Sequence, residues 1–373
     1  MMDNVRIDGV TPSRRNNEKR LNKNRWRGYS RKPDPDMFES KCKSCLQLDI
    51  IPKPKPDIFV NYRDSYHGDN YNLKDFFVAY SLEEDDTLSP KYFIYPPTFL
   101  AKDDYYFTRA SCNVLLHFYD EKSGSQVLWN PTTGGYKILP KPFVEPHPRI
   151  TSVPYSMGLW SDHRFEDYKV LNLVSSHLKV ERGLSHKSYH IDLYSLKLNS
   201  WKRIPCPDFN CRDGYSAACV AGVFYCIASL KRTDVIFVFD FSTETISTLP
   251  LPLPPPDNLC DYYYYFLEYK GLLSALACWD YKDTRVPLKY ELLIMSDGSW
   301  TKESVFHTRG GIQTPLWFSQ DGKLLYFVSV TNELVMFDRA IGELKHLGIE
   351  WASAHMRIKP MMIPFFESFV QLN

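Results

Sequence analysis

The sequence predicts an all-β protein, a β-propeller of about six four-stranded blades, and three observations lead to this fold class. A thirteen-residue pattern recurs in one register along the chain. Aromatic residues make up 15% of the 373 residues, a composition that favours strands. Units of four short apolar runs follow one another, and the segments between them show neither helix period nor helix caps.

The recurring pattern is a strand, a turn and a second strand. Its four ungapped copies are Leu128–Pro140, Leu193–Pro205, Val238–Pro250 and Met336–Gly348. The second position is always aromatic: Trp129, Tyr194, Phe239 and Phe337. The third position is always a turn-forming residue: Asn130, Ser195, Asp240 and Asp338. A fifth copy, Leu293–Lys302, has a turn that is shorter by about two residues.

Each four-strand unit carries this pattern as its third and fourth strands. Successive third strands, counted from Trp129, Tyr194, Phe239, Met295 and Phe337, lie 65, 45, 56 and 42 residues apart. Propeller blades repeat about every 40–50 residues, so loop insertions would account for the longer spacings. We predict six blades, with Phe76–Pro97 in the first and a ring-closing strand within Met361–Val370.

The chain divides by composition into a tail and a propeller. Residues 1–56 are predicted to be a disordered basic tail and linker, and residues 57–373 to form the propeller. The first 35 residues contain ten Lys or Arg and few apolar residues, which is typical of disorder. The basic pairs Arg14-Arg15 and Lys19-Arg20 are consistent with a solvated tail, with nuclear targeting or with nucleic-acid binding.

Charge bears on the class of partner, and cysteine content bears on the cellular compartment. The net charge is +1, which favours neither nucleic acid nor a membrane surface as a partner, and we expect neither. No stretch is long and apolar enough to span a bilayer, and the first residues lack the apolar core of a secretory signal. Nine scattered cysteines, several in apolar runs, indicate reduced thiols in a cytoplasmic or nuclear protein.

Several segments follow one another in an order that resembles one known family. They are Gly158-Leu159 with Asp167–Val170, Leu193–Trp201, Leu293–Thr301, Pro315–Gly348 and Phe366–Ser368. Together they resemble the plant F-box-associated domain, which includes the S-locus F-box-like proteins, over roughly residues 75–370. The resemblance implies a propeller that holds a target protein for an SCF-type ubiquitin ligase.

One part of the family pattern is missing from the sequence. Members of the family usually begin with a helical F-box, which docks a Skp-type adaptor. Here Lys41–Cys45 is the one trace of that segment, with Cys45 where the family has Trp. We therefore expect Skp-type adaptor and cullin partners only if an F-box lies upstream. An interaction module uncoupled from ubiquitination is the alternative.

The sequence contains no common catalytic motif: no GxSxG, P-loop, HExxH or dinucleotide-binding glycine pattern. Cys42 and Cys45 have the spacing of half a zinc site, but no nearby second pair completes it. We predict a non-enzymatic protein without cofactor or metal. The alternative is a propeller enzyme such as a glycan-processing hydrolase or an oxidase, which would need convergent carboxylates or metal ligands at the central channel.

Two long charged loops are the candidate binding site for a target protein. Ser176–Lys187 and Trp279–Leu288 each join a second strand to a third strand, and such loops open on one face of a propeller. Aromatic residues and Arg are favoured at interfaces. The predicted partner contacts are therefore Arg182, His186, Trp279, Tyr281 and Arg285. The alternative is that these are ordinary exposed loop residues.

Overall fold

A computed structural model gives the architecture of one compact unit, Pro52–Asn373. The predicted disordered tail, residues 1–56, lies outside the described residues. The structure describes residues 57–64, 74–83, 88–97, 106–112, 115–120, 123–143, 150–162, 167–178, 187–206, 209–211, 217–230, 233–252, 260–281, 288–308, 312–350, 362–365 and 370–372.

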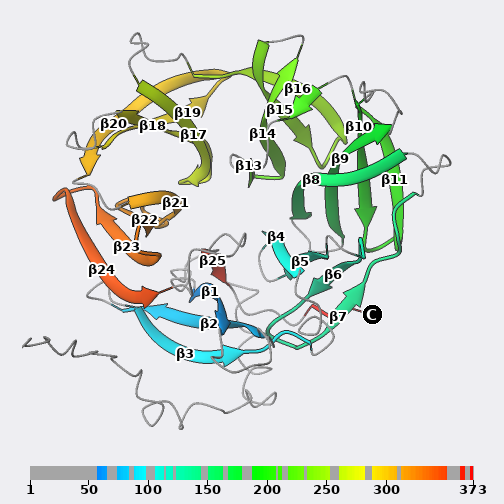
Figure 1. Ribbon diagram of the computed structural model, residues 1–373, viewed down its shortest axis with the longest axis horizontal. Helices are drawn as coiled ribbons and strands as arrows, with labels where there is room; N and C mark the ends of the chain where they lie inside the picture. Colours follow the sequence, from blue (N-terminus) through cyan, green and yellow to red (C-terminus); the bar gives the residue numbers. More distant parts are fainter. Residues whose placement is uncertain are drawn as a thin grey trace, which may run out of the picture. The chain divides into compact units, whose positions relative to one another are not determined.

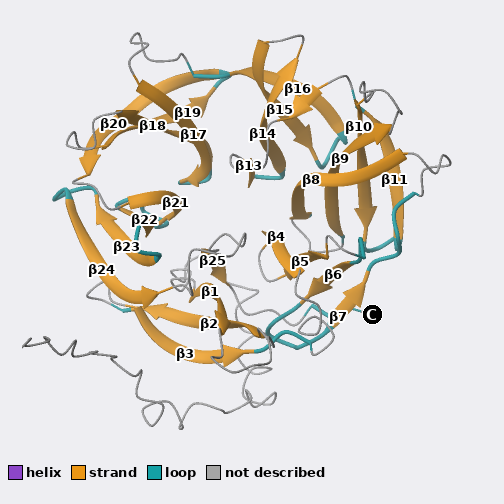
Figure 2. Cartoon of the chain, viewed as in Figure 1, coloured by secondary structure: helices purple, strands orange, loops and turns teal. Residues whose placement is uncertain are grey.

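Six antiparallel sheets stand around a ring, so the predicted six-bladed propeller is confirmed (Figure 1). In blades 2 to 6, strands that are consecutive in the chain run from the centre of the ring outward. In blade 4, two short strands share the inner position. Figure 2 shows strands connected by loops and turns, and the described residues contain no helix.

The blade boundaries agree with the predicted four-strand units, although β4 and β12 are not predicted by the sequence pattern. From inner to outer strand, blade 1 is β25 (Met362–Phe365), β1 (Asp57–Asp64), β2 (Lys74–Leu82) and β3 (Leu88–Ile94); blade 2 is β4 (Tyr106–Cys112), β5 (Leu115–Asp120), β6 (Gln126–Trp129) and β7 (Tyr136–Ile138); blade 3 is β8 (Ile150–Ser161), β9 (Tyr168–Leu178), β10 (Lys187–Ser195) and β11 (Ser200–Pro205). Blade 4 is β12 (Phe209–Cys211) with β13 (Ala217–Val220), then β14 (Val223–Leu230), β15 (Thr233–Asp240) and β16 (Thr245–Pro250); blade 5 is β17 (Cys260–Tyr269), β18 (Leu272–Tyr281), β19 (Leu288–Ser296) and β20 (Ser299–Thr308); blade 6 is β21 (Ile312–Phe318), β22 (Leu324–Ser329), β23 (Glu333–Asp338) and β24 (Glu343–Glu350).

The second and ninth positions of the repeat lie opposite each other in the third and fourth strands. In the four ungapped copies the pairs are Trp129–Tyr136, Tyr194–Trp201, Phe239–Ile246 and Phe337–Leu344. In the shorter copy, Met295 lies opposite Trp300. Directly opposed residues share one face of a sheet. The repeat therefore places an apolar pair on the same face of five blades.

The third position of the repeat stabilises the turn through its side-chain oxygen. Asn130 Oδ1 accepts a hydrogen bond from the Thr132 N–H at 3.0 Å, and Asp338 Oδ1 accepts one from the Ala340 N–H at 2.8 Å. Such short polar side chains replace backbone partners in turns. The seventh position has positive φ in all four ungapped copies: Gly134, Asn199, Glu244 and Gly342.

The ring closes through a strand from the end of the chain. β25 pairs antiparallel with β1, where Ile58 lies opposite Pro364. Beyond this strand, the Val370 carbonyl accepts a hydrogen bond from Asn130 Nδ2 at 3.0 Å, and Leu372 packs against the core between blades 2 and 3. The predicted ring-closing strand is confirmed, and it covers the inner edge of β1.

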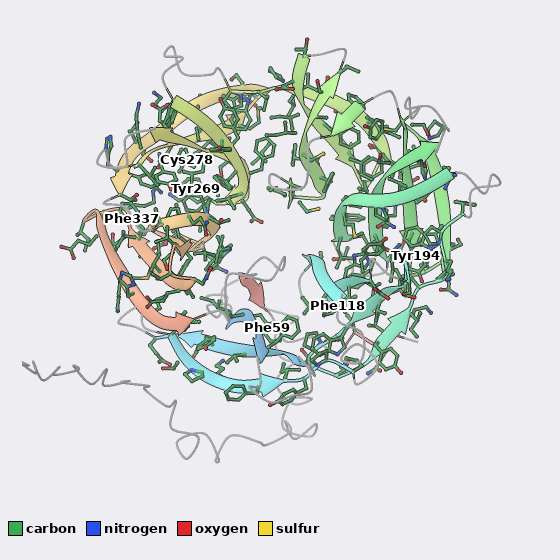
Figure 3. All side chains as sticks on the ribbon, viewed as in Figure 1. Phe59, Phe118, Tyr194, Tyr269, Cys278 and Phe337 are labelled. Atoms are coloured by element: carbon green, nitrogen blue, oxygen red, sulfur yellow. The ribbon has the colours of Figure 1, made fainter. Side chains whose placement is uncertain are left out.

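The hydrophobic core lies between neighbouring blades. Phe59 of blade 1 packs in one cluster with Phe118 of blade 2 (Figure 3). Tyr269 and Cys278 of blade 5 share another cluster with Phe337 of blade 6. Because each sheet buries both of its faces against its neighbours, the middle strands read as nearly continuous apolar runs.

Two Trp residues at position nine of the repeat join one blade to the preceding blade. The indole N–H of Trp201 donates to the Pro140 carbonyl at 2.6 Å. The indole N–H of Trp300 donates to the Pro250 carbonyl at 2.9 Å. Both prolines occupy the last position of the preceding repeat copy, so the pattern encodes contacts between blades as well as within them.

Gly158, in the first segment of the family resemblance, lies where blade 3 approaches blade 4. A Cβ atom at this position would lie 2.8 Å from Phe224 Cδ2 and 3.1 Å from Cys219 Sγ. Real Cβ atoms do not approach a buried ring so closely, because close-packed interiors leave no room. The close packing of the two blades therefore explains why position 158 is a glycine.

Candidate protein-interaction surface

The two faces of the ring carry different connections. Blades 2 to 6 are antiparallel meanders, so their first-to-second and third-to-fourth turns lie at one end of the strands. The second-to-third connections and the connections between blades lie at the other end. We call the first side the hairpin face and the second side the loop face.

The two predicted binding loops start from strand ends on the loop face, but they are shorter than predicted. Residues 176–178 belong to β9, and residues 279–281 belong to β18. Polar residues at these strand ends continue the ladder: His177 pairs with Lys187, and Tyr281 pairs with Cys260. The alternation of apolar residues in the sequence therefore identifies the middle of each strand but not its polar end.

The structure describes two of the five predicted contact residues, Trp279 and Tyr281. Arg182, His186 and Arg285 lie outside the described residues. Tyr281 is the last residue of β18, at the loop face. Trp279 lies in the same strand with its side chain 6% exposed, in the core cluster between blades 4 and 5. Trp279 is therefore a core residue rather than an exposed contact.

A lysine covers the buried Trp279 ring at this end of blade 5. Lys289 lies opposite Trp279 in the ladder, and its Nζ is 4.8 Å from the centroid of the ring. Glu291 accepts ion pairs from Lys289 and Lys302, each at 2.9 Å. Burial would raise the pKa of Glu291, but the two ammonium groups outweigh burial and lower it. The Glu291 carboxylate therefore remains ionised at neutral pH.

Two exposed apolar residues of the loop face were missed by the sequence reasoning. Tyr263 lies near the start of β17 and is 52% exposed, whereas its neighbour Tyr264 is buried and donates to the Pro252 carbonyl at 3.0 Å. Val330, which follows β22, is 62% exposed. The alternation of side chains along β17 could have separated Tyr263 from Tyr264, because successive residues point to opposite sheet faces.

Several buried polar side chains form hydrogen bonds where blades 2 and 3 pack together. Gln126 Oε1 lies 3.0 Å from His117 Nε2 and accepts a hydrogen bond from Asn172 Nδ2 at 3.1 Å. In the next strand, Asp192 accepts a bond from Arg203 Nε at 2.9 Å. The bond from Asn172 to Gln126 crosses from blade 3 to blade 2, so it joins the two blades, whereas the other two contacts lie within one blade each.

The described residues do not assemble a metal centre. No group of three or more His, Cys, Asp or Glu among them is placed to hold a metal ion, and Cys42 and Cys45 lie outside the described part. Five of the cysteines in the described ranges are free thiols: Cys112, Cys206, Cys219, Cys226 and Cys278. Burial raises the pKa of the Cys219 thiol to about 12. Within the described ranges, no helix is long and apolar enough to cross a membrane.

Arg339 connects blade 6 to blade 5 on the hairpin face. Its guanidinium donates to Glu303, to the Ser304 hydroxyl at 2.6 Å, to the Tyr269 hydroxyl at 3.1 Å and to the Gly322 carbonyl. Burial would raise the pKa of Glu303, but the hydrogen bonds from Ser304 and Tyr269 and the charge of Arg339 lower it. A lowered pKa means that the ionised carboxylate stabilises the folded state.

We expect Arg339→Met to lower the free energy of unfolding by about 2 kcal/mol at neutral pH, because buried partners lose charged hydrogen bonds. The effect depends on ionised Glu303. It should be fully present above the pKa of an unfolded glutamate, about 4.3, and should shrink as the pH falls through the lower folded pKa. Urea unfolding at neutral pH and at about pH 3 measures this difference.

Lys323→Met is the matched control for Arg339→Met, because Lys323 forms an exposed ion pair with Asp321 at 3.6 Å. Exposed pairs contribute about 0–1 kcal/mol, so this variant should unfold nearly as the parent does. An Arg339→Met effect of equal size at both pH values would contradict the role of ionised Glu303.

Known proteins match this chain at the level of family and fold. Residues 73–340 match the family described as F-box associated beta propeller domain. F-box protein At3g08750 of Arabidopsis thaliana is 26% identical over 161 residues, which are 42% of this chain and 36% of that protein. This match therefore spans little more than a third of the length of the relative.

Two solved structures align with most of this chain at low sequence identity. The crystal structure of a nidogen–laminin complex has a TM-score of 0.44 and 13% identity, covering 82% of this chain and 98% of that chain. The periplasmic gluconolactonase PpgL of Pseudomonas aeruginosa has a TM-score of 0.40 and 12% identity, covering 85% of this chain and 90% of that chain.

Proposed function

This chain belongs to the F-box associated beta propeller domain family, which has a protein-interaction role, and from that premise we propose that it holds a target protein for an SCF-type ubiquitin ligase. It performs no covalent chemistry itself. The propeller supplies the recognition, and the Skp-type adaptor and cullin join it only if an F-box is present upstream. The protein acts in the cytoplasm or nucleus, where reduced thiols persist.

One observation carries this proposal: a closed ring of blades holds the ends of β9 in blade 3 and β18 in blade 5, where the two predicted loops begin, on the same face of one scaffold. The strand ends at Leu178 and Tyr281 are both on the loop face, and β25 closes the ring that positions them. Loops on such scaffolds are where recognition concentrates. Because rigid strand ends reduce the entropy lost on binding, they favour a specific partner.

The loop face supplies the contact residues in this proposal. Arg182, His186, Tyr281 and Arg285 contact the target, and Trp279 supports them from the core beneath. Exposed Tyr263 adds apolar area on the same face, and aromatic and Arg side chains are the anchors that protein interfaces favour. The loop face thus combines cationic and aromatic groups suited to a folded protein surface.

Chemical crosslinking in cells, followed by mass spectrometry, tests the binding face. A loop-face variant carries Arg182→Ala, His186→Ala, Tyr281→Ala and Arg285→Ala. We expect it to lose the crosslinked partner that the parent captures, because the anchors are removed. Fusion of the parent chain to an F-box should shorten the half-life of that partner, and fusion of the variant should not.

A hairpin-face variant is the matched control: Lys197→Ala, Leu198→Ala, Ile341→Ala and Lys345→Ala. It carries the same number of alanine substitutions, all at exposed residues of turns or outer strands, and it should capture the partner as the parent does. Capture lost in the hairpin-face variant and retained in the loop-face variant would refute the assignment of the binding face. Stable levels of the partner with the fused parent chain would refute the ligase role.

A further inference from the structure

β7, the outer strand of blade 2, carries two exposed apolar side chains in three residues. Tyr136 is 45% exposed and Ile138 is 58% exposed. β7 is the last strand of its sheet and lies on the outside of the ring (Figure 1). Proteins usually protect such sheet edges with charges, proline or a covering segment, because an apolar edge pairs readily with another strand.

The equivalent outer strands are protected at the same positions of the repeat. Where blade 2 has Ile138, the other three ungapped copies have polar residues: Arg203, Thr248 and His346. Where blade 2 has exposed Tyr136, blade 3 has Trp201, whose indole is held by the carbonyl of the preceding blade. Among these four described copies, blade 2 differs by exposing apolar side chains at both positions.

The two faces of β7 have different chemistry. Tyr136 lies opposite Trp129 and Ile138 lies opposite Val127, on the sheet face that packs against blade 1. Lys137 points to the opposite face, because side chains alternate along a strand. Lys141 is exposed just beyond the strand, and residues 136–143 include no Asp or Glu. One face of the edge is therefore apolar and the other is cationic.

We propose that β7 takes up an extended segment of the target protein as an added strand, and that this segment alternates apolar and acidic residues. Its backbone pairs with the open edge of β7. Its apolar side chains pack on Tyr136 and Ile138, and its acidic side chains face Lys137 and Lys141. The inference rests on the proposed function, since it assigns a second contact to the same target.

A short fluorescent peptide of alternating valine and glutamate is the probe for this edge. Fluorescence anisotropy with the full chain should show saturable binding that weakens with salt. Ile138→Thr, which copies the residue of blade 4, should weaken binding about tenfold through lost apolar contact. Lys141→Glu should weaken it further. The control variants Ile341→Thr and Lys345→Glu make the same exchanges at exposed residues away from this edge and should bind as the parent does.

Two control peptides test the alternation and the charge. One has the same composition with valines and glutamates in separate blocks, and the other alternates valine and lysine. Neither should bind. The proposal is overturned if either control peptide binds like the probe, if Ile138→Thr binds normally, or if the parent chain does not bind the probe.

The loop-face variant separates this inference from the proposed function. It should bind the peptide like the parent chain, because none of its four substitutions is in β7 or at Lys141. Loss of target capture with peptide binding retained supports both ideas. Absence of peptide binding in the parent chain, with target capture intact, overturns the β7 proposal and leaves the loop-face proposal in place.

Discussion

Deletion of residues 362–373 should open the ring and lower the free energy of unfolding by on the order of 5 kcal/mol. The deletion removes β25, which pairs with the fully buried β1 residues Ile58, Phe59 and Val60. Their backbone partners are lost, and one side of an apolar strand becomes open to water. Differential scanning calorimetry and urea unfolding measure the loss.

A smaller deletion separates the closing strand from the residues that follow it. Removal of residues 370–373 leaves β25 but removes the Val370 carbonyl that accepts the Asn130 hydrogen bond. It should cost about 1–2 kcal/mol, as should Asn130→Ala. A peptide of residues 362–373 added to the longer deletion should restore part of the stability. Equal stability of the parent and the longer deletion would contradict closure by β25.

Trp129→Ala should lower the free energy of unfolding by about 3–5 kcal/mol, the range for loss of a large buried aromatic side chain. The Trp129 ring is 1% exposed and packs 5.5 Å from Phe77 and 5.8 Å from Phe118, measured between ring centroids. Removal leaves a cavity in the core between blades 1 and 2. Urea unfolding monitored by circular dichroism gives the difference.

Tyr136→Ala is the matched control, because Tyr136 lies directly opposite Trp129 in the same repeat copy. Tyr136 is 45% exposed, and substitutions at exposed positions usually change stability by less than about 0.5 kcal/mol. Losses of similar size in both variants would show that the two positions share one buried environment. That result would contradict the exposed edge of blade 2.

The repeat made much of the fold predictable because its signals are local. Aromatic residues at the second position, turn residues at the third and apolar residues at the ninth specify two paired strands. Pairing of Tyr194 with Trp201 follows from that spacing. The strands β4 and β12 were missed, because β4 mixes polar and apolar residues and β12 has three residues.

The candidate site was less predictable than the fold, because it depends on where strands end. Trp279 is typical of an exposed interface anchor in the sequence, but β18 extends past it and buries it between blades. Glu244 illustrates the same limit: it binds Lys169 at 2.9 Å and Lys202 at 2.6 Å, both in the preceding blade. No local pattern indicates such partners.

The sequence by itself determined the blades, their approximate number and the register of their outer hairpins, because these depend on residues within about thirteen positions of one another. Only the tertiary structure decided which strand the closing segment pairs with, which glycine a neighbouring blade requires, and which aromatic side chains are exposed. The reason is physical: each sheet is buried by its neighbours. Ile58 and Pro364 are far apart in the sequence, so the environment of each is defined only once their strands have paired.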